Sequence, residues 1–519
     1  MHRAVQTGAL LALLACCATA CVGPRLAQCP ANGGQPWSEL ESDHFVLQTD
    51  LPPQEAHQAV AYLERTRAAM LAAAWPEALK RDMPKLSVHV LADSSHFEGI
   101  FPRRIDGVFS RDGNEPFIVL HGPPSAWDKR FTGLSETTSS TVKHELAHYL
   151  SSYFLLRQPR WLAEGLAQFL ETLQLSGDGK TAVLGQPHLD AVSAMKTLLD
   201  AVDRGLMEKE DFTMKDVVTW EEVPEDAPDW TLSSRYAGSW LLVHWLYNTR
   251  AEQFAKLQAR LALGEDPQTA TQAVLPELYE PTLDKTLFEY VKSGSYQEFS
   301  VRIPVGALGT TERPLDDAEV HILRMRMLAV AAGLAEKDSE ERLKLALGEL
   351  DEALRQDPKS LLALKEKVAE APATERLPLA RALVETHPHE GKAWLVLAQV
   401  LKDDATTQAE REAAYKKAVE LSPRDANAAN SLAWFYVKQK RYEEALPLAQ
   451  RAVALAPWNS FVLDTYAVNL AGLGRCPEAI LTQKRALDLL QEHPNEALEK
   501  ELRERLQAFT PESCTPPAL

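Results

Sequence analysis

The residues best suited to chemistry stand in one short run, His-Glu-Leu-Ala-His at residues 144–148. Apolar residues at helical spacing around this run predict that it lies in a helix. Positions four apart on a helix of 3.6 residues per turn differ by about 40° around the axis, so the side chains of His144 and His148 project from one face. Two imidazoles at this spacing can share one tetrahedral zinc ion.

Glu145 lies on the adjoining flank of the same predicted helix. A zinc ion lowers the pKa of a water molecule toward neutrality, and a neighbouring carboxylate can then take its proton. We therefore predict that Glu145 acts as a general base in zinc-dependent hydrolysis. The alternative is an amphipathic helix whose histidines are merely polar.

A second predicted helix follows Pro159 and carries Trp-Leu-Ala-Glu-Gly-Leu-Ala at residues 161–167. The two motifs together resemble the gluzincin metallopeptidases, and most closely their bacterial peptidase-MA-like group. In that family the glutamate before the glycine is the third zinc ligand, so the resemblance assigns this role to Glu164. It also implies a zinc cofactor, a peptide or protein substrate and a zincin-like core over about residues 41–300. The alternative for Glu164 is a solvated surface glutamate.

The resemblance also points to Tyr236, in the segment at residues 234–240, because several gluzincins stabilise the oxyanion with a downstream tyrosine or histidine. A phenol can donate a hydrogen bond to a developing alkoxide. Tyr236 can equally be a packed aromatic, and His244 is a second candidate or a core residue. The Gly-x-Met-Glu-Asn element of related aminopeptidases is missing from the sequence, which favours an endopeptidase. A strand near residues 107–109 would then pair with an extended peptide.

The elements that must position these side chains indicate an α+β fold. We expect a small mixed sheet and a helical lobe in a metallopeptidase domain at residues 41–300. Prolines and glycines predict a linker at residues 301–320. The strands of the sheet are expected at residues 45–47, 86–91, 107–109 and 117–120.

Prolines recur at a regular interval in the last two hundred residues, at positions 358, 388, 423, 457 and 494. A period near 34 residues is typical of tetratricopeptide repeats. The clearest unit spans residues 426–459, and we predict an all-α repeat solenoid over residues 321–510. Such a solenoid would bind a protein partner or substrate in its concave face. An irregular helical bundle is the alternative.

The N-terminus has the layout of an export signal at residues 1–20, with a basic start and an apolar centre. Ala-Thr-Ala at residues 18–20 precedes Cys21, which resembles a bacterial lipobox and predicts lipidation of Cys21. Cys16 is a rival site, and a plain secretory signal is the alternative. We expect a Pro- and Gly-rich tether at residues 21–40 and a location in the cell envelope (periplasm or outer membrane), with the lipid as the only membrane attachment.

Export implies an oxidising compartment, in which Cys476 and Cys514 can form a disulfide across one helical stretch. Two unpaired thiols are an equal alternative. The chain has 73 acidic and 55 basic residues and a net charge of −18. So acidic a surface repels phosphate backbones, and we expect no nucleic-acid partner.

These observations predict a zinc-dependent metallopeptidase of the cell envelope with a tetratricopeptide tail. In it His144, His148 and Glu164 bind Zn²⁺, Glu145 is the base, and Tyr236 stabilises the oxyanion. A catalytically inactive zincin-fold lipoprotein, acting only as a scaffold through its repeats, is the alternative. A structural protein without metal is a third possibility, which the complete ligand set disfavours.

Overall fold

The computed structural model describes most of the chain beyond the predicted signal peptide. The predicted lipidation site, Cys21, and its rival Cys16 lie outside the described residues. Within the described part, no helix combines the length and the apolar character that crossing a membrane requires. The described residues are 26–81, 83–101, 107–110, 115–128, 130–132, 135–137, 140–204, 212–220, 229–304, 309–335, 338–490 and 495–514.

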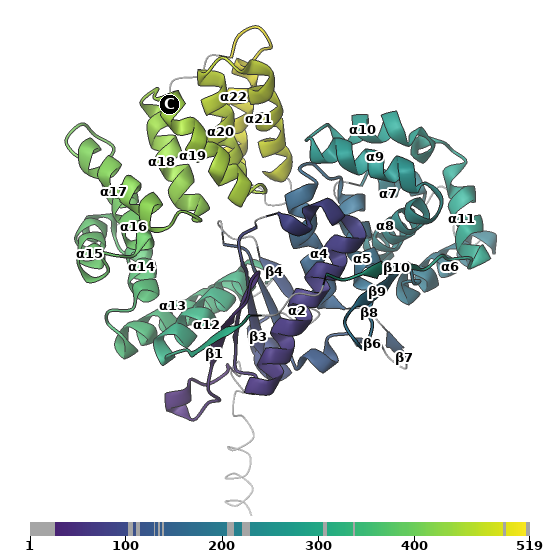
Figure 1. Ribbon diagram of the computed structural model, residues 1–519, viewed down its shortest axis with the longest axis horizontal. Helices are drawn as coiled ribbons and strands as arrows, with labels where there is room; N and C mark the ends of the chain where they lie inside the picture. Colours follow the sequence, from purple (N-terminus) through teal and green to yellow (C-terminus); the bar gives the residue numbers. More distant parts are fainter. Residues whose placement is uncertain are drawn as a thin grey trace, which may run out of the picture.

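A mixed six-stranded sheet organises the N-terminal half of the molecule (Figure 1), and its strands run in the order β11-β1-β2-β3-β5-β4. The pairs β2–β3 and β3–β5 are parallel, and antiparallel strands flank them on both sides. Strand β4 is at one edge, as expected for residues 107–109. The strands are β1 (Ser38–Glu41), β2 (Phe45–Thr49), β3 (Leu86–Leu91), β4 (Val108–Ser110), β5 (Phe117–His121) and β11 (Thr311–Pro314).

Helices pack on this sheet and continue into a helical lobe. Helix α2 buries Ala56, Val60 and Leu63 in the same core as Phe45 and Leu47 of the sheet, which follows from its apolar residues at helical spacing. The helices of this half are α2 (Pro53–Ala74), α3 (Ser94–Ile100), α4 (Thr141–Phe154), α5 (Arg160–Glu171), α6 (Leu189–Asp203), α7 (Met214–Val218), α8 (Asp229–Thr249), α9 (Ala251–Ala262), α10 (Pro267–Val274) and α11 (Leu283–Ser293). Smaller sheets add β6 (Arg130–Thr132) with β7 (Ser135–Thr137), and β8 (Gln174–Leu175), β9 (Thr181–Leu184) and β10 (Phe299–Arg302).

The structure differs from the sequence prediction at both predicted connecting segments. The tether expected at residues 21–40 packs from residue 26 onward, because Ala27, Cys29 and Trp37 are buried against α12 (Asp317–Gly333). The linker expected at residues 301–320 contains β11, which pairs with β1. Prolines and glycines suggested connecting segments in both places, but the described residues of each are held by burial or by strand pairing with distant residues.

A polar cluster holds the first of these segments to the helices that follow. The Cys29 thiol lies 3.2 Å from Nε2 of His321, and Nδ1 of His321 lies 2.6 Å from a carboxylate oxygen of Glu349. Arg324 also pairs with Glu349, at 2.6 Å. Residues near the start and the middle of the chain therefore share one buried network.

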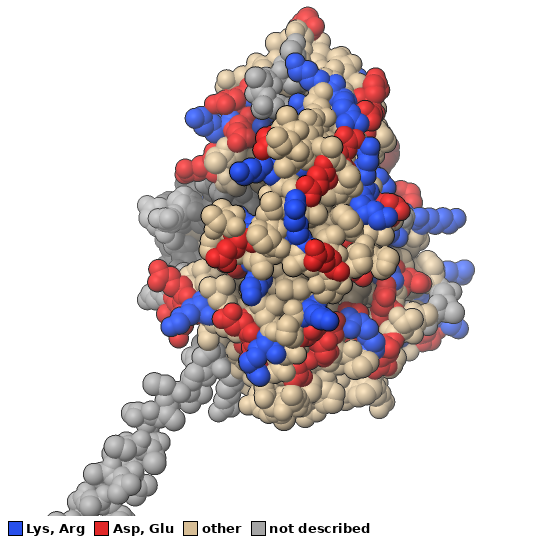
Figure 2. All heavy atoms as spheres, turned by 90° about the vertical axis from the view of Figure 1, so that its left-hand side faces the viewer, with Lys and Arg blue, Asp and Glu red and all other residues tan. Residues whose placement is uncertain are grey.

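The C-terminal region is a series of antiparallel helix pairs. In the pair α18–α19, small residues such as Ala433 and Ala445 are fully buried and let the helices approach closely. Figure 2 shows acidic and basic side chains interspersed over the face at the left of Figure 1. The helices are α12 (Asp317–Gly333), α13 (Ser339–Gln356), α14 (Leu361–Glu370), α15 (Ala373–Thr386), α16 (Gly391–Val400), α17 (Gln408–Leu421), α18 (Ala426–Lys438), α19 (Tyr442–Leu455), α20 (Ser460–Gly472), α21 (Cys476–Leu490) and α22 (Glu496–Ala508).

A disulfide between Cys476 and Cys514 joins the start of α21 to the segment after α22. Of the two alternatives open from the sequence, the structure has the bonded one. Cys29 is the free cysteine of the described residues, and it is buried.

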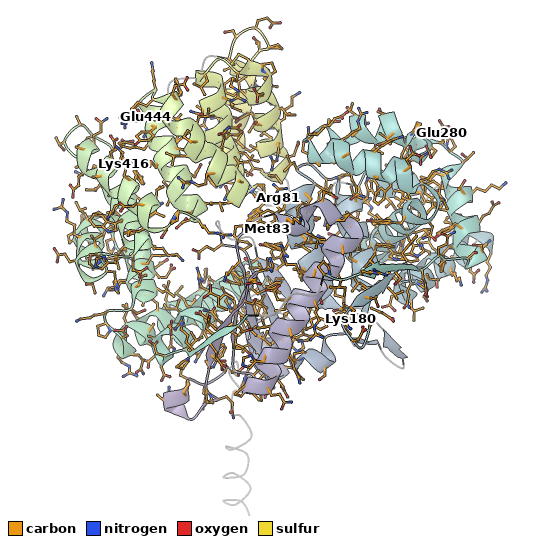
Figure 3. All side chains as sticks on the ribbon, in the orientation of Figure 1. Arg81, Met83, Lys180, Glu280, Lys416 and Glu444 are labelled. Atoms are coloured by element: carbon orange, nitrogen blue, oxygen red, sulfur yellow. A yellow bond between two sulfur atoms is a disulfide. The ribbon has the colours of Figure 1, made fainter. Side chains whose placement is uncertain are left out.

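The repeat helices pack directly on the N-terminal half. Arg424, before α18, donates a hydrogen bond of 2.8 Å to the carbonyl oxygen of Met83, a residue that Figure 3 labels. Ala426 and Trp458 belong to the same hydrophobic core as the residues of α4. The solenoid is therefore built onto the first region by a shared core.

Candidate metal and catalytic site

Two consecutive helices, α4 and α5, carry the predicted ligands. Helix α4 begins after Ser140, whose hydroxyl accepts a hydrogen bond from the backbone N–H of Lys143. A loop of five residues ends at Pro159, and α5 begins at the next residue, Arg160. Gly165 allows α8 to pack against α5, because a Cβ at this position would lie 2.4 Å from the carbonyl oxygen of Ser239. The glycine beside Glu164 thus fixes the position of the helix that carries this carboxylate.

The side chains of His144, His148 and Glu164 converge on one point. The two Nε2 atoms are 3.1 Å apart, and Oε2 of Glu164 lies 3.6 Å from His144 and 3.5 Å from His148. Tetrahedral zinc with bonds of 2.0–2.2 Å requires ligand atoms roughly 3.3–3.6 Å apart. Among the described residues, these three side chains form the group whose ligand atoms lie close enough together to bind one metal ion.

The Glu164 carboxylate supports this fit independently. Its Oε2 atom is buried and has no hydrogen-bond donor with acceptable geometry. Burial alone would raise the pKa of Glu164, but the two histidines hold it well below its usual range. An ionised, undersatisfied carboxylate facing two imidazole nitrogens is a donor set suited to a divalent cation.

Glu171 and His188 extend the site and were missed by the sequence reasoning. A carboxylate oxygen of Glu171 lies 2.9 Å from Nδ1 of His144, and the other lies 3.0 Å from Nε2 of His188. Burial raises the pKa of Glu171, but the bonds with both histidines lower it below its usual range. The carboxylate therefore holds the proton of His144 on Nδ1 and leaves Nε2 free for a metal.

A sequence signal for Glu171 did exist. It follows Glu164 by seven residues on α5, which is close to two helical turns, so both carboxylates occupy one face. His188 follows β9, and only the fold brings it to Glu171.

Glu145 lines a cavity of about 610 Å³ together with His148 and Glu164. Burial raises the pKa of Glu145 above its usual value. A carboxyl group with a raised pKa is a better proton acceptor than a fully solvated one, as general base catalysis requires. The repeats contribute Pro457 and Trp458 to the lining of the same cavity.

Tyr236 lies on α8, half-buried, with its ring packed edge-on against Trp220 at 5.3 Å between centroids. Burial, and then the negative charge of Glu164, raise the pKa of Tyr236 to about 12. The phenol therefore keeps its proton at neutral pH and can donate a hydrogen bond, but Tyr236 is not among the residues that line the cavity.

His244, the second candidate for this role, is a core residue. It is fully buried, with Nδ1 2.8 Å from the hydroxyl of Tyr290 and Nε2 3.0 Å from the carbonyl oxygen of Gly185. Burial lowers its pKa to about 4. This buried position does not support the role of oxyanion stabiliser that the sequence suggested for His244 as a second candidate.

Comparisons with known proteins match two parts of the chain. Residues 138–264 match a family described as "Protein of unknown function (DUF1570)", and residues 414–446 match the tetratricopeptide repeat family. No curated protein matches the chain. The first match contains all the side chains of the candidate site, and its description assigns them no role.

Solved structures of tetratricopeptide proteins are similar to part of the chain. A thermophilic TPR protein of Thermus thermophilus is 19% identical over 37% of this chain and 97% of its own, with a TM-score of 0.28. YrrB, described as a TPR protein with an unusual peptide-binding site, is 19% identical over 34% and 91%, with a TM-score of 0.24. MamA is 14% identical over 34% and 93%, also with a TM-score of 0.24. Together with the family match, the helix pairs identify tetratricopeptide repeats at the C-terminus, following a mixed α/β region with a small sheet.

Proposed function

We propose that the protein is a zinc-dependent peptidase whose metal ligands are His144, His148 and Glu164. The observation that carries the proposal is the mutual spacing of the three ligand atoms: two of the distances, 3.5 and 3.6 Å, match tetrahedral zinc, and the third, 3.1 Å, is slightly shorter. The cavity beside them leaves room for a substrate, as a catalytic rather than a purely structural metal site needs.

The roles of the remaining side chains follow from their positions. Zinc, when bound, supplies a Lewis acid and lowers the pKa of a water molecule. The Glu145 carboxylate takes the proton from the attacking water and later gives it to the leaving amine. Tyr236 donates its phenolic proton in a hydrogen bond to the oxygen that becomes negative. Glu171 and His188 hold the ring of His144 in place.

Three further features belong to the same proposal. Tetratricopeptide repeats suggest a protein-interaction role, and we assign to them the recruitment of a protein partner or substrate. Export to the cell envelope and lipidation at Cys21 are retained from the sequence. The endopeptidase assignment is retained from the sequence, and β4 is the last strand in the order of the six-stranded sheet.

A comparison of the wild type with Glu145→Gln tests the activity. Both proteins should contain about one zinc per chain by metal analysis, and only the wild type should cleave a peptide library. His148→Ala should lose both the metal and the cleavage. Zinc bound without any cleavage that depends on Glu145 would favour the inactive scaffold, and a protein that binds no zinc would refute the metal site.

A further inference from the structure

The cavity at the candidate metal site has walls from two parts of the chain that are far apart in sequence. Glu145, His148 and Glu164 line one side, and four residues of the repeats line the other. Pro457 and Trp458 precede α20, and Asp488 and Leu489 lie near the end of α21. The repeats are thus part of the site itself.

Several contacts hold this wall in place. The Trp458 ring packs edge-on against Tyr153 at 4.7 Å between centroids, and the Tyr153 hydroxyl donates a hydrogen bond of 3.3 Å to the carbonyl oxygen of Leu455. Arg157, in the loop after α4, forms ion pairs with Asp266 at 3.2 Å and with Asp488. Because Trp458 is only 7% exposed, the wall belongs to the core.

The distance between the metal ligands and this wall can be read along α4. Tyr153, which contacts Trp458, follows His148 by five positions, which is a rise of about 8 Å along the helix axis at 1.5 Å per residue. An extended peptide advances about 3.3 Å per residue. A peptide held at the ligands would therefore reach the repeat wall two or three residues from the bond to be cleaved.

The chemistry of the wall identifies what it would receive. The carboxylate of Asp488 forms an ion pair with Arg157. The two charges compensate each other, so this pair does not attract a charged side chain of the substrate. Polar side chains such as Gln158 and Gln268 line other parts of the cavity, but apart from Asp488 the repeats contribute apolar surface, through Pro457, Trp458 and Leu489. An apolar side chain gains free energy on such a surface, and a charged one loses hydration.

We propose that the tetratricopeptide region forms a specificity pocket of the active site, which selects an apolar side chain two or three residues from the scissile bond. This inference rests on the proposed peptidase function. It gives Trp458 and Leu489 a role in substrate choice, separate from any partner bound elsewhere on the solenoid.

The test uses fluorescein-labelled octapeptides of Gly and Ser that carry a single Leu, Phe, Lys or Glu. Binding to the full-length Glu145→Gln protein is measured by fluorescence anisotropy, so that the peptides stay intact. Trp458→Ala and Leu489→Ala are added to this background. Phe461→Ala is the control, since Phe461 is an aromatic residue of the same repeat, 55% exposed and outside the cavity lining.

Both pocket variants should bind the Leu and Phe peptides about five- to tenfold more weakly than the parent, with unchanged binding of the Lys and Glu peptides. Phe461→Ala should match the parent. Leu489 is only partly buried, so its truncation tests the pocket even if Trp458→Ala unfolds. An unchanged apolar preference in the pocket variants, or no preference in the parent, would overturn the inference.

The same variants with Glu145 restored separate this inference from the proposed function. If the preference for Leu and Phe peptides depends on Trp458 and Leu489 but the wild type cleaves no peptide, the pocket is supported and the peptidase function is refuted. Cleavage whose sequence preference ignores both residues would refute the pocket and leave the peptidase intact.

Discussion

Replacement of Glu171 by glutamine tests how the candidate metal site is held. The Glu171 residue is 4% exposed, and its carboxylate bonds to His144 at 2.9 Å and to His188 at 3.0 Å. Glutamine keeps the shape but removes the negative charge, and its amide nitrogen cannot accept a hydrogen bond. At least one of the two histidines then loses its acceptor, and His144 loses the charge that favours its Nδ1–H form.

The expected consequence is a loss of zinc affinity of about 10–100-fold, equivalent to about 1.4–2.7 kcal/mol. Competition with a chromophoric chelator measures the affinity directly, without any reference to activity. Glu280→Gln is the matched control, because Glu280 is exposed and lies in the helical lobe (Figure 3). Zinc binding by a folded Glu171→Gln protein at the wild-type affinity would refute the reasoning.

Two further predictions concern stability. Gly165→Ala places a Cβ 2.4 Å from a backbone oxygen, so it should lower the free energy of unfolding in urea by about 1–3 kcal/mol. Gly348→Ala, in a helix with open space around it, should raise it by about 0.5–1 kcal/mol; equal effects would contradict the close packing at Gly165. Burial lowers the pKa of His321, but the bonds with Cys29 and Glu349 outweigh it and raise the pKa to about 9. The protonated histidine therefore stabilises the fold fully below about pH 6.5, and this contribution, at most about 3 kcal/mol, is lost as the pH rises through 9. Urea unfolding from pH 6 to 10 should show the decline in the wild type and not in His321→Gln; parallel curves would exclude His321 as its source.

The features that could be predicted from sequence are those that repeat locally. The spacing of His144 and His148 follows from the helical period, and it needs no partner from elsewhere in the chain. The proline interval near 34 residues identified the repeats in the same way, since each repeat packs mainly on its neighbours. Strands β2, β3, β4 and β5 were predicted from the sequence, but β1 and β11, which pair with each other, were not.

Tertiary structure alone decided the features that join distant segments. His188 reaches Glu171, β11 pairs with β1, and Trp458 lines the cavity beside His148. No periodic pattern marks these residues, because each contact depends on where two separate elements meet when the core closes. The sequence by itself determined which side chains share one helix face, and the packing of the sheet, the lobe and the repeats determined which faces meet.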